Sequence, residues 1–164
     1  MSIRRAAVAI GLLALVTSGG LVGCGKKDDF EDHTAIVTIG GKATTYQLDS
    51  CGRDHETVFV VGRAKDGSVL QAVVGTKKDH KTGVLDSTGL SIIHDPDSVS
   101  AFGKESWARR GPSGTAPGTI TSARIRGSRI QVSTLAQPVD ADESPTAADP
   151  ITTTLDARCD AQDQ

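Results

Sequence analysis

The chain has 164 residues, of which 37% are hydrophobic and only 3% aromatic, and its formal net charge is −2 at pH 7. This length fits one ordinary domain. The basic residues are dispersed and aromatic residues are few, so the composition gives no indication of a nucleic-acid-binding protein.

The N-terminal segment has the three-part layout of a secretory signal peptide. Arg4 and Arg5 precede an apolar run over residues 6–17, and three small residues, Ser18-Gly19-Gly20, follow it. A membrane span needs about 20 apolar residues, so the run is too short for a stable transmembrane helix. The segment therefore predicts export from the cytoplasm.

The end of this segment predicts a lipid anchor. Leu21-Val22-Gly23-Cys24 resembles the bacterial lipobox, in which the cysteine receives a diacylglyceryl group and the preceding residues are removed. Residues 1–23 are then the signal peptide, and residues 24–33 form the lipidated cysteine and a short polar tether. Two fatty chains give stable attachment, which predicts a protein on the outer face of the cell membrane. A plain signal peptide with an incidental cysteine is the alternative.

The two remaining cysteines, Cys51 and Cys159, most simply pair in an exported protein. Their disulfide would close a loop of about 108 residues, for which the chain-entropy model gives about 4.7 kcal/mol of stabilisation. The alternative is a nucleophilic Cys51 with His55 nearby in the sequence.

The remaining chain is rich in alternating and β-branched runs, which predict strands. These runs cover residues 34–39, 43–49, 57–61, 68–74, 90–93, 119–126, 129–139 and 151–157. Gly40-Gly41, Asp66-Gly67 and Gly127-Ser128 predict hairpin turns, the last in a hairpin that accommodates a bulge. Residues 75–88 and 140–150 are expected to be polar loops, the first of them mobile.

Residues 97–111 allow two interpretations. Asp97 or Ser98 could cap a short helix that Gly111 ends, with Arg109 and Arg110 favourable near its C-terminus. A strand through Val99, Ala101 and Gly103 is the competitor, and we favour the helix. The sequence thus predicts one mainly β, antiparallel domain over residues 34–160, a sandwich or curled sheet with one short helix, and a frayed tail at 161–164.

The order of these segments resembles that of a known family. The lipobox is followed by a strand–Gly-Gly–strand segment ending in cysteine (VTIGGKATTYQLDSC), a later hairpin with a Gly-Ser turn (ARIRGSRIQVSTLAQPVD) and a final strand ending in cysteine (TTTLDARC). This layout resembles the mycobacterial nineteen-kilodalton lipoprotein antigen family of actinobacterial envelope lipoproteins. The short charged tether and the segment around Phe102 and Trp107 depart from it. The resemblance implies a membrane-anchored envelope antigen without established catalysis, with Cys24 lipidated and Cys51 and Cys159 paired.

No motif indicates a catalytic, metal or cofactor site. His33, His55, His80 and His94 lack the spacing of common metal sites, and no serine lies in a nucleophile elbow. The segment His94-Asp95-Pro96-Asp97 could bind a cation weakly, although a turn followed by a helix cap explains the same residues.

Three arginines, Arg124, Arg126 and Arg129, surround the third hairpin. On one exposed face they could contact an acidic polymer or lipid head groups. Such residues are more often simply the solvent side of an antiparallel strand pair.

The sequence therefore predicts a non-enzymatic envelope lipoprotein with an interaction or structural role. A carrier for a lipid or small amphiphile is the alternative, because a curled sheet can hold a pocket. An enzyme acting on envelope material is the least supported hypothesis. The membrane, through Cys24, is the only partner that the sequence predicts; a protein, cell-wall or lipid partner stays unknown.

Overall fold

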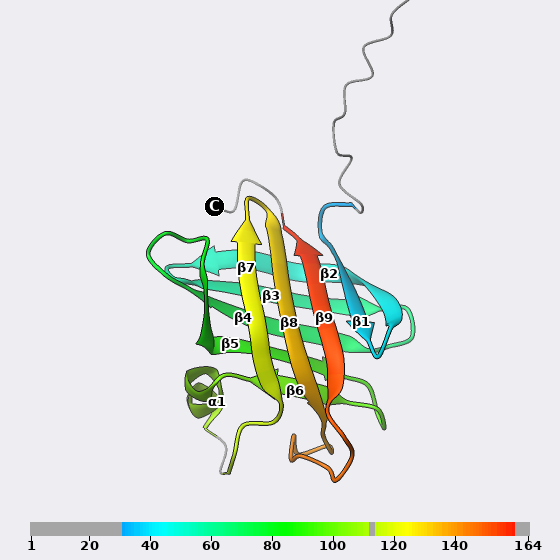
Figure 1. The fold of residues 1–164 in the computed structure, drawn as a ribbon. Coiled ribbons are helices and arrows are strands. Elements are labelled where there is room, and N and C mark those ends of the chain that lie inside the picture. Colours follow the sequence, from blue (N-terminus) through cyan, green and yellow to red (C-terminus); the bar gives the residue numbers. More distant parts are fainter. Residues whose placement is uncertain (1–30, 112–113, 160–164) are drawn as a thin grey trace, which may run out of the picture.

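The computed structural model describes residues 31–111 and 114–159, which form a mainly β domain (Figure 1). The elements in chain order are β1 (Thr34–Ile39), β2 (Lys42–Asp54), β3 (Thr57–Ala64), β4 (Val69–Thr76), β5 (Gly83–Ile93), β6 (Val99–Phe102), α1 (Lys104–Arg110), β7 (Thr119–Arg126), β8 (Arg129–Pro138) and β9 (Ile151–Arg158). Every strand pairing is antiparallel. The mainly β class and the single short helix are confirmed, while the predicted signal peptide, Cys24 and the frayed tail lie outside the described residues.

The three predicted hairpins are present. Gly40 and Gly41 connect β1 to β2 with φ angles of 55° and 89°, a left-handed pair that suits a two-residue hairpin turn and that glycine adopts without strain. Gly67 and Gly127, also with positive φ, lie in the turns between β3 and β4 and between β7 and β8. The β7–β8 pair has a register shift between Ile120 and Ser122, in agreement with the expected bulge.

The sheet closes into a barrel, which is more specific than the predicted sandwich or curled sheet. The strand order is β6-β5-β4-β3-β2-β1-β9-β8-β7, and β6 also pairs with β8. Val99 and Ser100 of β6 lie opposite Pro138 and Gln137 of β8, so β6 joins one end of β5 to one end of β8. At the other end of the junction between β5 and β8, β7 pairs with β8. Arg124 of β7 also forms an isolated bridge with Thr82, which lies just before β5.

The expected mobile loop over residues 75–88 is wrong in extent. Thr76 pairs with Gly83 and Gly75 with Val84, so only residues 77–82 separate β4 from β5. In the first half of β5, the exposed Leu85 is followed by the polar residues 86–88, and Thr88 is fully buried with its Oγ1 donating to the Val84 carbonyl oxygen at 2.8 Å. The strand is held by backbone pairing with β4 rather than by an alternating apolar pattern, and the sequence therefore did not reveal it.

The segment over residues 97–111 contains both a strand and a helix. Residues 99–102 form β6, and α1 begins only at Lys104, with Gly103 as its N-cap in place of the predicted Asp97 or Ser98. Gly111 ends the helix in the left-handed conformation at φ 76°, as predicted. The first half of the segment is a strand because it pairs on both edges, with β5 and with β8.

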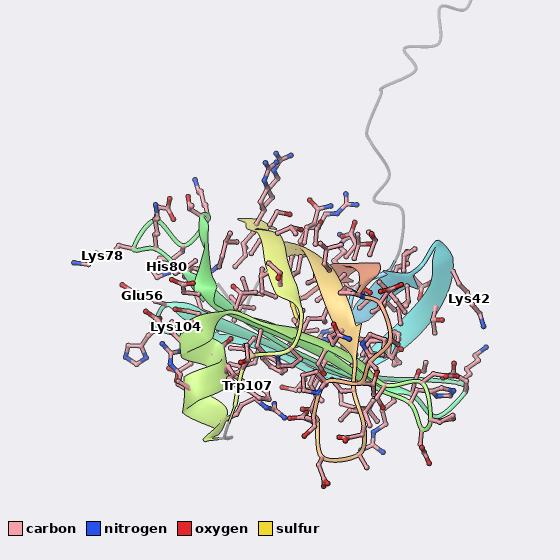
Figure 2. The ribbon with its side chains drawn as sticks, turned by 60° about the horizontal axis from the view of Figure 1, so that its bottom comes forward. Lys42, Glu56, Lys78, His80, Lys104 and Trp107 are labelled. Carbon is pink, nitrogen blue, oxygen red and sulfur yellow. A yellow bond between two sulfur atoms is a disulfide. The ribbon has the colours of Figure 1, made fainter. Side chains whose placement is uncertain are left out.

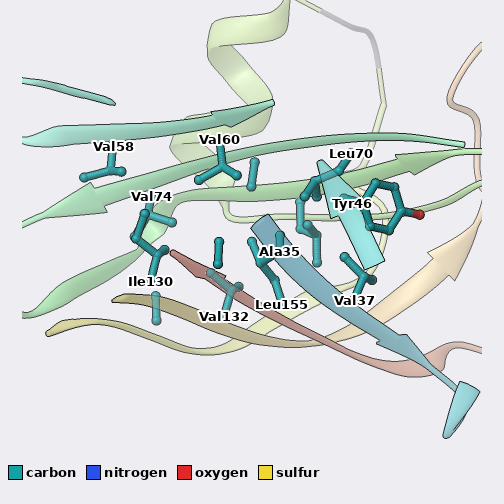
Figure 3. Close-up of a cluster of buried hydrophobic side chains, with 14 of the residues drawn as sticks. Ala35, Val37, Tyr46, Val58, Val60, Leu70, Val74, Ile130, Val132 and Leu155 are labelled. Carbon is teal, nitrogen blue, oxygen red and sulfur yellow. The ribbon is translucent and has the colours of Figure 1, made fainter. Parts of the chain in front are cut away.

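Inward-facing side chains from the strands fill the barrel (Figure 3). Ala35 and Val37 of β1, Val60 of β3, Leu70 of β4 and Leu155 of β9 are each at most 1% exposed. They belong to one continuous cluster of buried residues that receives side chains from nearly every strand. The two hollows described below lie at one end of this filled barrel and on its outer face.

Candidate functional site

The sulfur atoms of Cys51 and Cys159 form a disulfide across 108 residues. Cys51 lies in β2 and Cys159 directly follows β9, and both are at least nine-tenths buried. The Cys159 amide also donates to the Ser128 carbonyl oxygen at 2.9 Å. Cys51 is therefore joined to Cys159 at the end of the barrel where β9 finishes, rather than placed beside His55 as a free nucleophile.

Three of the histidines lie in turns rather than in a common site. His33, His55 and His80 have φ angles between 52° and 55°, the left-handed conformation that histidine enters more readily than most residues. His55 Nδ1 lies 2.6 Å from Asp54 Oδ1 in an exposed turn. Within residues 31–111 and 114–159, no three His, Cys, Asp or Glu residues are grouped so that they could hold a metal ion.

The fourth histidine, His94, lies at an open hollow of about 450 Å³ at one end of the barrel, which we call the mouth hollow. Its walls come from the β3–β4, β5–β6 and β8–β9 connections and from strand residues near this end of the barrel, including the end of β1 and the start of β2. The apolar lining residues are Ile39, Ile92, Pro96, Val99, Pro138, Val139 and Ile151, and the polar ones are Lys42, Thr44, Tyr46, Asp66, Ser68, His94, Asp97, Ser98 and Thr146.

A chain of three polar side chains lies on one wall of the mouth hollow. Ser68 Oγ is 2.6 Å from Asp66 Oδ1 and 2.9 Å from the Tyr46 hydroxyl. A serine hydroxyl has one hydrogen and an ionised carboxylate only accepts, so Ser68 donates to Asp66 and accepts from Tyr46. Tyr46 and Ser68 are 1% and 2% exposed, while Asp66 is at the surface. The chain thus connects the buried core with the rim.

Two pKa values reflect this arrangement. Hydrogen bonds from the Ser68 hydroxyl and amide lower the pKa of Asp66, and the nearby His94 adds to the effect. Burial raises the pKa of Tyr46. Asp66 is therefore a carboxylate and Tyr46 a neutral phenol near neutral pH. A carboxylate with a lowered pKa is a weak base, so this group is better suited to accepting hydrogen bonds from a ligand than to removing protons.

The mouth hollow is lined by His94, Pro96 and Asp97 of the segment His94-Asp95-Pro96-Asp97, for which the sequence suggested weak cation binding. The His94 amide donates to Ser98 Oγ at 3.0 Å, which is the turn that the alternative interpretation predicted. Tyr46, Ser68 and Asp66 were not predicted as site residues. They come from β2 and from the β3–β4 connection, distant in sequence from His94, and the Asp66-Gly67 signal indicated only a turn.

A second hollow, of about 380 Å³, lies between α1 and the outer face of β3, β4 and β5. Phe59, 44% exposed, contributes to its apolar lining together with Val61, Val73 and Phe102, and Arg109 and Arg110 border it. The Arg110 guanidinium lies 5.0 Å from the centre of the Phe102 ring and bonds Glu143 at 2.6 Å. Arg110 is thus already bound within the domain.

The predicted arginine cluster is divided by the structure. Arg124 and Arg126 of β7 are exposed, whereas Arg129 donates to Asp156 through Nε at 2.8 Å and Nη2 at 2.5 Å. The fork is bidentate, which orders Arg129 against β9. Only the first two arginines are thus available to an external anion.

The described part of the chain has no helix with the length and apolar character needed to cross a membrane. A scan against protein-family models finds no match, and a search of the curated proteins finds none either. The function is therefore argued below from the residues of this chain and their arrangement.

Proposed function

We propose that this protein is a lipid-anchored protein of the cell envelope whose β domain has a non-enzymatic interaction or structural role. The observation that carries the proposal is the segment Leu21-Val22-Gly23-Cys24 after a charged and then apolar leader. A diacylglyceryl group on Cys24 would supply two fatty chains, enough for stable attachment. The place of action is then the outer face of the cell membrane.

Two features of the domain support this proposal. The disulfide between Cys51 and Cys159 suits an oxidising compartment outside the cytoplasm. The first described strand, β1, lies between β2 and β9 and pairs with each over six residues. A pull on the tether would therefore act on a strand held on both edges.

The test is the fate of Cys24 in a bacterial host that processes lipoproteins. We expect the mature chain to partition into the detergent phase and its N-terminal peptide to have the mass of a lipidated Cys24. A Cys24→Ala variant should stay unprocessed or be released without lipid, while Cys51→Ala/Cys159→Ala should keep the lipid. A mature N-terminus elsewhere, or an unmodified Cys24, would contradict the proposal.

The mouth hollow favours a second candidate function, the binding of a small amphiphile. Its lining offers apolar side chains such as Ile39 and Ile151 together with the Asp66 carboxylate and the Thr44 hydroxyl. A ligand with a short apolar body and a hydroxyl or ammonium head would match both. Because side chains fill the barrel in Figure 3, we place this ligand at the mouth rather than inside.

Two neighbouring threonines test the second candidate. Thr44 lines the hollow, whereas Thr45 faces outward on the same strand and is exposed. We expect native mass spectrometry of the secreted domain to show a bound mass that disappears on denaturation. Thr44→Trp should abolish it by filling the hollow, and Thr45→Trp should leave it unchanged. A bare wild-type chain, or equal loss in both variants, would argue against this function.

A further inference from the structure

Five exposed cationic side chains gather at one end of the barrel. Lys77, Lys78 and Lys81 lie in the connection between β4 and β5, and Arg124 and Arg126 lie on β7. We call these five residues the basic rim. Within residues 31–111 and 114–159, none of the five forms a salt bridge. Figure 2 shows Lys78 extending away from the sheet into solvent.

Backbone pairing makes the basic rim continuous. The Ile125 amide donates to the Lys81 carbonyl oxygen at 3.1 Å, and Thr82 is bridged to Arg124. The β4–β5 connection, distant in sequence from β7, is thereby fixed beside it. The five positive charges therefore form one surface rather than two separate loops.

The basic rim lies at the same end of the barrel as the start of the domain. Arg126 is opposite Arg129, Arg129 is opposite Arg158, and Arg158 is opposite Thr34, the first residue of β1. Figure 1 shows the β7–β8 turn, the end of β9 and the start of β1 along one side of the molecule. The tether therefore reaches the domain at the basic end.

Two of the acidic residues on this end are paired with arginines, and the others are fewer than the exposed cations. The Asp79 carboxylate accepts the Thr82 hydroxyl at 2.7 Å and the Lys81 amide at 2.9 Å, bonds that lower its pKa to about 2. Asp54 contacts His55, and Asp32 and Asp156 pair with Arg158 and Arg129. Asp79 therefore stays ionised, and the exposed Asp54 and Glu56 lie at the same end. These three carboxylates offset only part of the five positive charges of the basic rim.

The opposite end of the barrel has the reverse character. The mouth hollow and the β8–β9 connection carry the exposed residues Asp66, Asp95, Asp97, Asp140, Asp142 and Asp149, against Lys42 and Lys65. Exposed cations therefore outnumber exposed acids at the tether end, and exposed acids outnumber exposed cations at the mouth hollow. Composition alone conceals this, because the formal charge of the chain is only −2.

We propose that the basic rim rests on the anionic head groups of the membrane in which the chain is anchored, so that the mouth hollow faces outward. This inference rests on the proposed anchor at Cys24. Residues 24–33 can span at most about 35 Å when fully extended, which keeps the rim near the bilayer. Lys and Arg are attracted to an anionic surface within about one Debye length, roughly 10 Å at 0.1 M salt. Arginines can also bind phosphate oxygens in a bidentate manner.

The test measures binding of the unlipidated mature chain, residues 25–164, to vesicles. This part is suitable because all nine strands and the described core lie between residues 34 and 159. Co-sedimentation is compared for vesicles of equal parts phosphatidylglycerol and phosphatidylcholine and for phosphatidylcholine alone. We expect binding to the anionic vesicles only, and its loss at high salt.

Matched charge reversals then locate the contact. We expect Lys78→Glu/Lys81→Glu and Arg124→Glu/Arg126→Glu each to weaken binding to anionic vesicles by about tenfold or more. The control, Lys42→Glu/Lys65→Glu, changes the net charge equally at the opposite end and should bind like the wild type. Fluorescence of Trp107 confirms that each variant is folded.

Three outcomes would overturn the proposal: equal binding to both kinds of vesicle, equal loss in the control and rim variants, or binding to a soluble anionic polymer with none to anionic vesicles. These outcomes do not involve lipidation, because the tested chain carries no anchor. An unmodified Cys24 in cells would instead contradict the proposed function, so the two failures can be told apart.

Discussion

At the scale of single residues, Gly103 shows a strict spatial requirement. A Cβ atom at this position would lie 2.1 Å from the Leu85 carbonyl oxygen and 2.6 Å from the Asp86 Cα. The φ of Gly103 is −71°, an ordinary value, so the requirement is space and not backbone conformation. The absence of a side chain lets the junction of β6 and α1 approach the backbone of β5.

We therefore expect Gly103→Ala to lower the free energy of unfolding by about 1–3 kcal/mol, because backbone atoms would have to move to admit the methyl group. Gly52→Ala is the matched control, since a Cβ there meets no heavy atom within 4 Å. Urea denaturation of both variants measures the difference. Equal midpoints for the two variants would show that β5 and the β6–α1 junction adjust without cost.

At the scale of elements, turns with glycine were predictable and turns without it were not. Gly40-Gly41 signalled the β1–β2 hairpin through its conformational freedom. The β2–β3 turn instead contains His55, a residue with positive φ, and Glu56. No glycine or proline lies in this turn to mark its position. The predicted strand ended at Asp49, whereas β2 continues to Asp54.

The helix illustrates the same limit. Arg109, Arg110 and Gly111 correctly indicated where α1 ends, because the preferences at a helix C-terminus are local. Its start was predicted too early. Ser106 Oγ donates to the Thr88 carbonyl oxygen at 2.7 Å, and Phe102 packs against Trp107 with ring centres 5.3 Å apart. These contacts with β5 and β6 position the helix, and they are not encoded in the local pattern.

At the scale of the whole molecule, the disulfide constrains most of the chain. The loop that it closes contains nearly all of the strands, from the end of β2 through β9. In the chain-entropy model, cross-linking over such a distance removes many conformations of the unfolded state. The bond therefore stabilises the barrel as a unit rather than one hairpin.

We expect Cys51→Ala/Cys159→Ala to lower the free energy of unfolding by about 4–5 kcal/mol. Chemical denaturation of the oxidised wild type and of the double variant gives the difference. Added reductant should lower the stability of the wild type to a similar extent and leave the double variant unchanged. A variant as stable as the oxidised wild type would mean that the closed sheet and its core suffice without the cross-link.

The β class, the three glycine hairpins, the end of the helix and the candidate cysteine pair could all be predicted from the sequence, because each depends on local conformational preference or on cysteine count. Lipidation of Cys24 stays a prediction of the sequence. The tertiary structure decided the closure of the sheet through β6 and β8, the position of β5, the mouth hollow and the basic rim. These features join residues far apart in the chain, such as Tyr46 with Ser68 and Lys81 with Ile125. Such pairings depend on strand order and register, which local patterns leave open.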